Sequence, residues 1–181
     1  SSYLTFLVTM ANRPLFYVHG NHDTRYEQQP PEGCDCIDGK VVEFKGYRIL
    51  GLGGCMKYNN SPLQYTERQM KRRIFKLRRQ IKRGGVDILV NHSPSEGLGD
   101  MDDPCHRGFT CFRTLLDELQ PRYHLHGHVH LQYGTNLPRT QEYGETTIVN
   151  ASGKYLVELP DRPCPVRPKG LGGWLRHVVT L

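Results

Sequence analysis

Short apolar runs that end in polar residues recur along this chain, and they predict buried β-strands followed by loops. Residues 15–18 form one such run between a proline and a glycine, residues 86–90 form a second, and residues 123–125 form a third. Short apolar runs bounded by turn residues are typical of strands covered on both faces. The pattern therefore predicts at least three interior strands spread over most of the chain.

Further strands are predicted on either side of these three. Residues 41–44 and 47–52 flank Lys45 and Gly46, which is the pattern of a β-hairpin with a glycine turn. Residues 146–151 and 155–159 are apolar enough to close the domain as two more strands.

Two segments have the periodicity of helices. In residues 66–83, Met70, Ile74, Leu77 and Ile81 recur at spacings of four, three and four, and a pair of glycines follows. In residues 109–119, apolar residues also gather on one helical face, and a proline closes the segment. Strands and helices alternate along the chain, so the fold class is α/β.

The first helix carries much of the formal net charge of +6. Among its basic residues are Lys71, Arg72, Arg73, Lys76, Arg78, Arg79, Lys82 and Arg83. We interpret it as a helix docked on the core with a solvated basic face. Attraction of nucleic acid is the alternative, although Phe75 is the one aromatic residue there that could stack on a base.

Composition limits the class of protein. With 181 residues, 37% of them hydrophobic, the chain suits one globular domain with a real core. It has no long apolar run and no basic leader before an apolar stretch, so we expect no membrane partner and no signal peptide. Six cysteines without zinc-type spacing indicate reduced thiols and a cytoplasmic location, although Cys34 and Cys36 leave a metal or redox role open.

Three polar clusters each follow a predicted strand: residues 20–23 (Gly-Asn-His-Asp), 91–94 (Asn-His-Ser-Pro) and 127–130 (Gly-His-Val-His). In open α/β sheets, sites form at the carboxyl ends of strands. Histidine nitrogens and an asparagine oxygen suit Mn, Fe or Zn better than Ca or Mg. On an extended segment His128 and His130 would point the same way and reach two adjacent metal ions.

Each cluster alone has a simpler interpretation. A single histidine at a strand end is more often a hydrogen-bonded structural residue than a ligand. The Gly-Asn-His-Asp segment alone could be a turn whose aspartate caps a helix. The three clusters together, in this order and each after an apolar strand, favour a metal site.

These clusters resemble the last three motifs of the calcineurin-like metallophosphoesterase superfamily, which are G-N-H-[DE], a lone histidine after a strand, and G-H-x-H. The similarity runs through about residues 4–159, and the stretches 51–54, 106–109 and 148–151 also resemble small, single-domain members. It implies a four-layer α-β-β-α sandwich, a metallophosphoesterase domain over residues 1–159, and a separate Pro/Gly/Arg-rich tail over residues 160–181, which we expect to be loosely held.

The resemblance also implies roles for individual residues. Asn21, His92 and His128 would bind the second metal ion and His130 the first. The cofactors would be two divalent transition-metal ions, Mn, Fe or Zn, with a hydroxide between them that attacks phosphorus. The expected activity is hydrolysis of phosphate esters, with phosphodiesters preferred by analogy with the family.

Four more residues are candidates for contact with the substrate. The resemblance places His22 on the scissile phosphate, with Asp23 orienting its ring. His106 and Arg107 lie in the loop after His92 and could bind a substrate phosphate, the arginine by paired hydrogen bonds.

The first two motifs of the family, D-x-H and G-D, precede the G-N-H-[DE] motif, and residues 1–19 contain neither of them. They would supply an aspartate and a histidine to the first metal, and a carboxylate that bridges both. We therefore expect the first strands of the fold to be missing from these residues, in a stretch of about 30 residues or more. The alternative function is a non-catalytic binding module, or an inactive fragment with half a metal site.

Overall fold

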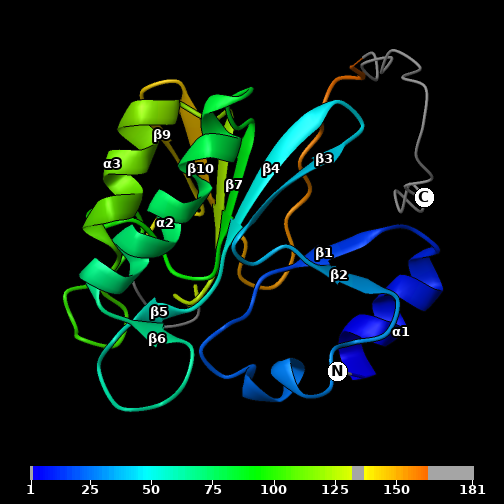
Figure 1. The fold of residues 1–181 in the computed structure, drawn as a ribbon, viewed down its shortest axis with the longest axis horizontal. Helices are drawn as coiled ribbons and strands as arrows, with labels where there is room; N and C mark the ends of the chain where they lie inside the picture. The colour runs from blue at the N-terminus through cyan, green and yellow to red at the C-terminus, as the bar shows by residue number, and fades with distance from the viewer. Residues whose placement is uncertain (1, 132–136, 163–181) are drawn as a thin grey trace.

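The computed structural model describes residues 2–131 and 137–162 as an α/β fold built around one six-stranded sheet (Figure 1). The strand order in this sheet is β3 (Lys40–Phe44), β4 (Tyr47–Leu52), β7 (Ile88–Asn91), β8 (Tyr123–His126), β10 (Thr146–Asn150) and β9 (Thr140–Tyr143). The four inner strands are parallel, and the edge strands β3 and β9 are antiparallel to their neighbours. The expected α/β class is confirmed.

The remaining elements lie around this sheet. They are α1 (Ser2–Ala11), α2 (Glu67–Lys82), α3 (Thr110–Leu119), the short 3-10 helix η1 (Thr24–Glu27), and two pairs of short parallel strands, β1 (Leu15–Tyr17) with β2 (Cys34–Cys36) and β5 (Cys55–Met56) with β6 (Gln64–Tyr65). Figure 1 shows α2 and α3 on one side of the large sheet, and β1, β2 and α1 on the other. The layers therefore run helix, sheet, sheet, helix, as expected.

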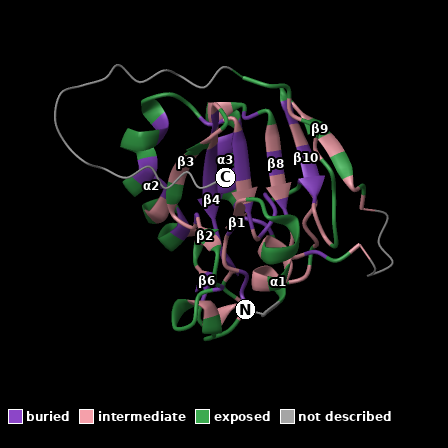
Figure 2. Ribbon diagram, turned by 90° about the vertical axis from the view of Figure 1, so that its right-hand side faces the viewer, coloured by how far each residue is buried: buried purple, intermediate pink, exposed green. Residues whose placement is uncertain are grey.

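Two apolar clusters hold the layers together. The larger one joins α2 and α3 to the sheet and includes Leu50, Leu89, Phe112 and Ile148. The smaller one fills the space between the large sheet and the β1–β2 pair, and Ile37 is its most buried member. Figure 2 shows that the buried residues are concentrated in the inner strands, between these clusters, whereas the outer side of α2 is exposed.

Helix α2 forms where its periodicity predicts. The side chain of Thr66 accepts from the backbone of Gln69, and the Gln69 side chain accepts from the backbone of Thr66, which is a capping box. Its apolar stripe, from Met70 to Ile81, is buried against the sheet. The predicted hairpin is also confirmed, with Lys45 and Gly46 both at positive φ in the turn.

Some expectations about elements are wrong. The segment 155–159 is not a strand, and only Leu159 packs against a core cluster there. The strand expected over residues 86–90 begins at Ile88 and extends to Asn91. Helix α1 and the strands β2 and β9 have no counterpart in the sequence-based prediction. The apolar residues of α1 show little helical period, and the two strands are short and polar.

The start of the expected tail is attached to the domain. Tyr47 donates its hydroxyl to the carbonyl of Pro160, and Arg162 forms an ion pair with Asp87 at 2.6 Å. Residues 163–181, including Cys164, lie outside the described residues, so the separate tail stays a prediction. No helix in the described part of the chain is long and apolar enough to cross a membrane.

Candidate metal centre

The three polar clusters of the sequence meet at one edge of the fold. Asn21 follows β1, His92 follows β7, and His128 follows β8, so each side chain comes from the carboxyl end of a strand. His92 Nε2 lies 2.9 Å from Asn21 Oδ1 and 3.1 Å from His128 Nδ1. Three atoms that can each offer a lone pair to a metal therefore converge on one point.

Neighbouring groups orient two of these side chains. His128 Nε2 lies 2.7 Å from the carbonyl oxygen of Cys105. A carbonyl oxygen can only accept a hydrogen bond, so Nε2 carries the proton of the neutral ring and Nδ1 has the lone pair. The Asn21 amide donates from Nδ2 to the hydroxyl of Tyr58 at 3.2 Å, and this leaves Oδ1 directed at His92. These two contacts therefore direct Nδ1 of His128 and Oδ1 of Asn21 toward Nε2 of His92.

Burial keeps these imidazoles uncharged. Burial, with a smaller contribution from neighbouring His128, lowers the pKa of His92 to about 3. The pKa of His128 is also lowered, mainly by burial. His92 and His128 are therefore neutral near pH 7, which is the protonation state that a metal needs in its histidine ligands.

The donor set fits a divalent transition metal, but the residues present supply only part of a coordination shell. No group of three or more His, Cys, Asp and Glu side chains suited to a metal occurs in residues 2–131 and 137–162. No carboxylate of that part of the chain therefore joins His92 and His128 here, and the third donor is the amide of Asn21. Asn21, His92 and His128 remain the residues that would hold the ion.

Next to this centre, the side chain of His22 is exposed, whereas that of Asp23 is bonded to the backbone of its own turn. His22 Nε2 lies 3.2 Å from Nδ2 of Asn21. Asp23 accepts from the backbone N–H of Gly20 at 2.7 Å and so closes the turn that carries Asn21. The expectation that Asp23 orients the ring of His22 stays a prediction.

The last motif differs in backbone from what its sequence suggested. His128 has a φ of 66°, in the left-handed region, and the backbone N–H of Val129 bonds back to Gly127. The expectation of an extended His-Val-His segment is therefore wrong. His130 is exposed, with Nδ1 3.5 Å from Ser152 Oγ, and its place as a ligand of the first metal stays a prediction.

The loop after β7 folds back over the centre. Asp100 accepts from the backbone N–H groups of Gly97 and Gly108, and Asp103 bonds to His106 at 2.9 Å. This brings the ring of His106 to 5.3 Å from that of His128, whereas Arg107 is exposed. Both remain candidates for contact with a substrate phosphate.

Other residues at the site gave no signal in the sequence. Tyr58 reaches Asn21 from 37 positions along the chain, and no periodicity links the two. Asp38 accepts from Arg73 and the backbone of Gly53, and it lies 3.4 Å from His19 next to the Gly-Asn-His-Asp turn. These contacts depend on tertiary structure alone.

Comparisons with known proteins agree with the fold and with the family that the sequence resembles. The family profile of the calcineurin-like phosphoesterases matches residues 1–132. A UPF0046 protein of Caenorhabditis elegans is 29% identical over 126 residues, which cover 66% of this chain and 41% of that protein. Metallophosphoesterase domain-containing protein 1 of Homo sapiens is 38% identical over 71 residues, which cover 38% of this chain and 20% of that protein. This chain therefore spans less than half the length of either relative.

A solved structure extends the comparison to three dimensions. The crystal structure of TT1561 of Thermus thermophilus superposes with a TM-score of 0.57 and 17% identity, covering 82% of this chain and 67% of that one. At this identity the likeness shows a shared fold. The family profile, which spans most of the sequence, shows that the chain belongs to the calcineurin-like phosphoesterase family.

Proposed function

We propose that this chain carries part of the active site of a metal-dependent phosphoesterase that hydrolyses phosphate esters, with phosphodiesters preferred. The observation that carries the proposal is the convergence of Asn21 Oδ1 and His128 Nδ1 on His92 Nε2, each within 3.1 Å of it, at the carboxyl ends of three strands. Family membership supports the general activity. The preference for diesters and the second metal ion, with His130 as its ligand, rest on analogy with the family.

The chemistry expected of the bound ions, Mn, Fe or Zn, is to acidify a water between them into a nucleophile and to neutralise phosphate charge. This chain's own residues would position that chemistry. Asn21 donates to His22 Nε2, so the proton of a neutral His22 ring is on Nδ1. That nitrogen could donate to a phosphate or leaving-group oxygen, and His106 could bind the phosphate from the opposite loop.

The test compares hydrolysis of bis(p-nitrophenyl) phosphate and p-nitrophenyl phosphate by the purified protein, with Mn²⁺ and with a chelator. His22→Ala is expected to lower kcat about 100-fold or more while metal content per chain stays unchanged. Arg25→Ala, on the neighbouring η1, is the matched control and is expected to keep full activity. Unchanged turnover in His22→Ala would remove the role assigned to His22.

Elemental analysis of the folded protein separates this function from the alternative. Bound transition metal with chelator-sensitive hydrolysis supports the esterase. One bound ion without turnover supports a binding module that keeps only the Asn21, His92 and His128 centre. The free thiols of the described cysteines support a cytoplasmic location, which stays part of the proposal.

A further inference from the structure

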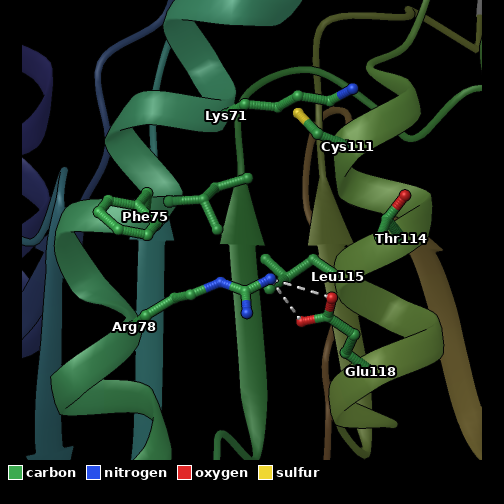
Figure 3. Close-up of a pocket in the computed structure, with 8 residues that line it drawn as sticks. Lys71, Phe75, Arg78, Cys111, Thr114, Leu115 and Glu118 are labelled. Carbon is green, nitrogen blue, oxygen red and sulfur yellow. Dashed lines mark hydrogen bonds and ion pairs between the residues drawn. The ribbon is translucent and has the colours of Figure 1, made fainter.

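A groove between α2 and α3 lies on the outer side of the helical layer and is unrelated to the metal centre (Figure 3). Its volume is about 310 Å³. Ile74, Leu115 and Cys111 are buried and line it with apolar surface. Lys71 and Arg78 extend across it from α2, and Arg78 reaches Glu118 of α3 at 3.1 Å. None of these residues belongs to the proposed phosphoesterase site.

The wall formed by α2 is uniformly basic. We call the exposed residues of segment 68–83 the basic face, and every charged residue on it is a lysine or an arginine. Glu67, the one acidic residue of α2, is turned inward and accepts from the backbone N–H of Cys111. Among the described residues no ion pair holds Arg72, Lys76 or Arg79. Such a field attracts an anionic partner.

Phe75 adds an apolar contact in the middle of this charge. It lines the groove, yet 73% of its surface is exposed. The stripe that anchors α2 in the core consists of Met70, Ile74, Leu77 and Ile81, so Phe75 contributes little to that packing. An exposed aromatic residue at the edge of an apolar groove is typical of a surface that binds another protein.

We propose that the groove and the basic face bind an acidic segment of a partner protein, which inserts one apolar side chain between α2 and α3. The basic face would attract the segment and set its direction along α2. The buried floor of Ile74, Leu115 and Cys111 would stabilise the inserted side chain by removing it from water. Phe75 would cover that side chain from the outer edge.

Charge and shape together favour a protein segment over other anions. Nucleic acid offers phosphate but no aliphatic side chain for the groove, and binding of single strands usually needs several aromatic platforms where the basic face has Phe75 alone. A membrane surface needs a helix whose apolar stripe is free, and the stripe of α2 is buried in the core.

The experiment uses two short fluorescein-labelled peptides of aspartate and glutamate that differ only at the central residue, leucine or glycine. Fluorescence anisotropy measures their binding to the full chain at low and high salt. The leucine peptide is expected to bind about 10- to 100-fold more tightly than the glycine peptide, and both are expected to weaken as salt rises.

Two variants locate the binding. Lys76→Glu, on the basic face, is expected to weaken both peptides about 2- to 10-fold, whereas Lys154→Glu, an equal charge change at an exposed position after β10, should leave binding unchanged. Thr114→Trp places a large side chain at the groove and is expected to abolish the advantage of leucine without affecting the glycine peptide.

Three results would overturn the proposal. Equal affinity for the leucine and glycine peptides would mean that the groove holds no side chain, and this comparison needs no variant to fold. Equal loss in Lys76→Glu and Lys154→Glu would mean that binding is unspecific attraction to the net charge. Stronger binding of oligothymidylate than of the leucine peptide would assign the basic face to nucleic acid.

Discussion

Replacement of Gly20 by alanine tests whether the turn before Asn21 is packed against the metal centre as tightly as the structure indicates. A Cβ at this position would lie 2.9 Å from Cε1 and 3.1 Å from Nδ1 of His92, and 3.0 Å from Oδ2 of Asp23. Ordinary contacts begin at 3.4 Å, so the imidazole or the turn has to move by about 0.5 Å. The His92 ring cannot yield freely, because it is held between Asn21 and His128.

The matched control is Gly127→Ala, in the other glycine-containing motif. Its Cβ would meet nothing closer than the carbonyl oxygen of His92 at 3.8 Å. Neither glycine has a positive φ, so backbone strain does not separate the two variants. Overpacking should lower the free energy of unfolding of Gly20→Ala by about 1–3 kcal/mol. Gly127→Ala should keep it or raise it by up to about 1 kcal/mol, because alanine restricts the unfolded chain.

Urea unfolding followed by circular dichroism measures the effect on stability, and calorimetric titration with Mn²⁺ measures the effect on the site. Metal ligands tolerate displacements of only about 0.2 Å, so Gly20→Ala should also weaken metal binding about 10- to 100-fold. A Gly20→Ala variant as stable as the parent, or a Gly127→Ala variant that loses more stability, would refute the steric argument regardless of whether the metal binds.

Three further predictions concern groups around the site and in the core. Neither ring nitrogen of the fully buried His124 has a partner in the described part of the chain, so His124→Leu should raise the free energy of unfolding at pH 7 by about 1 kcal/mol. Burial holds the pKa of His124 well below 6.5, so below that pH the unfolded chain binds a proton that the folded chain does not. His124 alone should therefore lower the free energy of unfolding by about 1.4 kcal/mol for each pH unit below 6.5, and His124→Leu should remove that contribution, as urea unfolding across this pH range would measure. Tyr58→Phe frees the amide of Asn21 and should weaken Mn²⁺ binding about tenfold with little change in melting temperature, and an unchanged affinity in calorimetry would contradict this. Burial raises the pKa of the Cys55 thiol to about 12 and also raises that of Cys111, so iodoacetamide at pH 8 should leave both unmodified in the native protein, as mass spectrometry would detect.

The sequence predicts the elements that have a strong period of their own. The stripe of α2 and the apolar runs of β7 and β8 are examples. The order of apolar residues within each of these segments is enough to show which element it forms. Strands β2 and β9 could not be predicted, because their own sequences lack such a pattern. Their Cys-Asp-Cys and Thr-Gln-Glu-Tyr sequences carry little hydrophobic signal, and only pairing with β1 and β10 makes them strands.

The candidate site likewise has features that the sequence predicts and features that it does not. Motif order alone predicts that His92 and His128 lie together, since the parallel strands β7 and β8 end on the same side of the large sheet, whereas Asn21 reaches them from β1, in the separate β1–β2 pair. The left-handed backbone at His128 and the hydrogen bond from Asn21 to Tyr58 were not accessible from the sequence. Both depend on how separate loops meet once the layers have packed.

The distance along the chain between the three ligands has a consequence for folding. His92 is 71 positions from Asn21 and 36 from His128, so forming the centre closes two long loops. The entropy of such closures has to be offset by packing of both apolar clusters before the three atoms can meet. A metal that binds there recognises the completed tertiary structure and not an early intermediate. Metal uptake would thus report the last stage of assembly, and a chelator would selectively shift the equilibrium toward the unfolded chain.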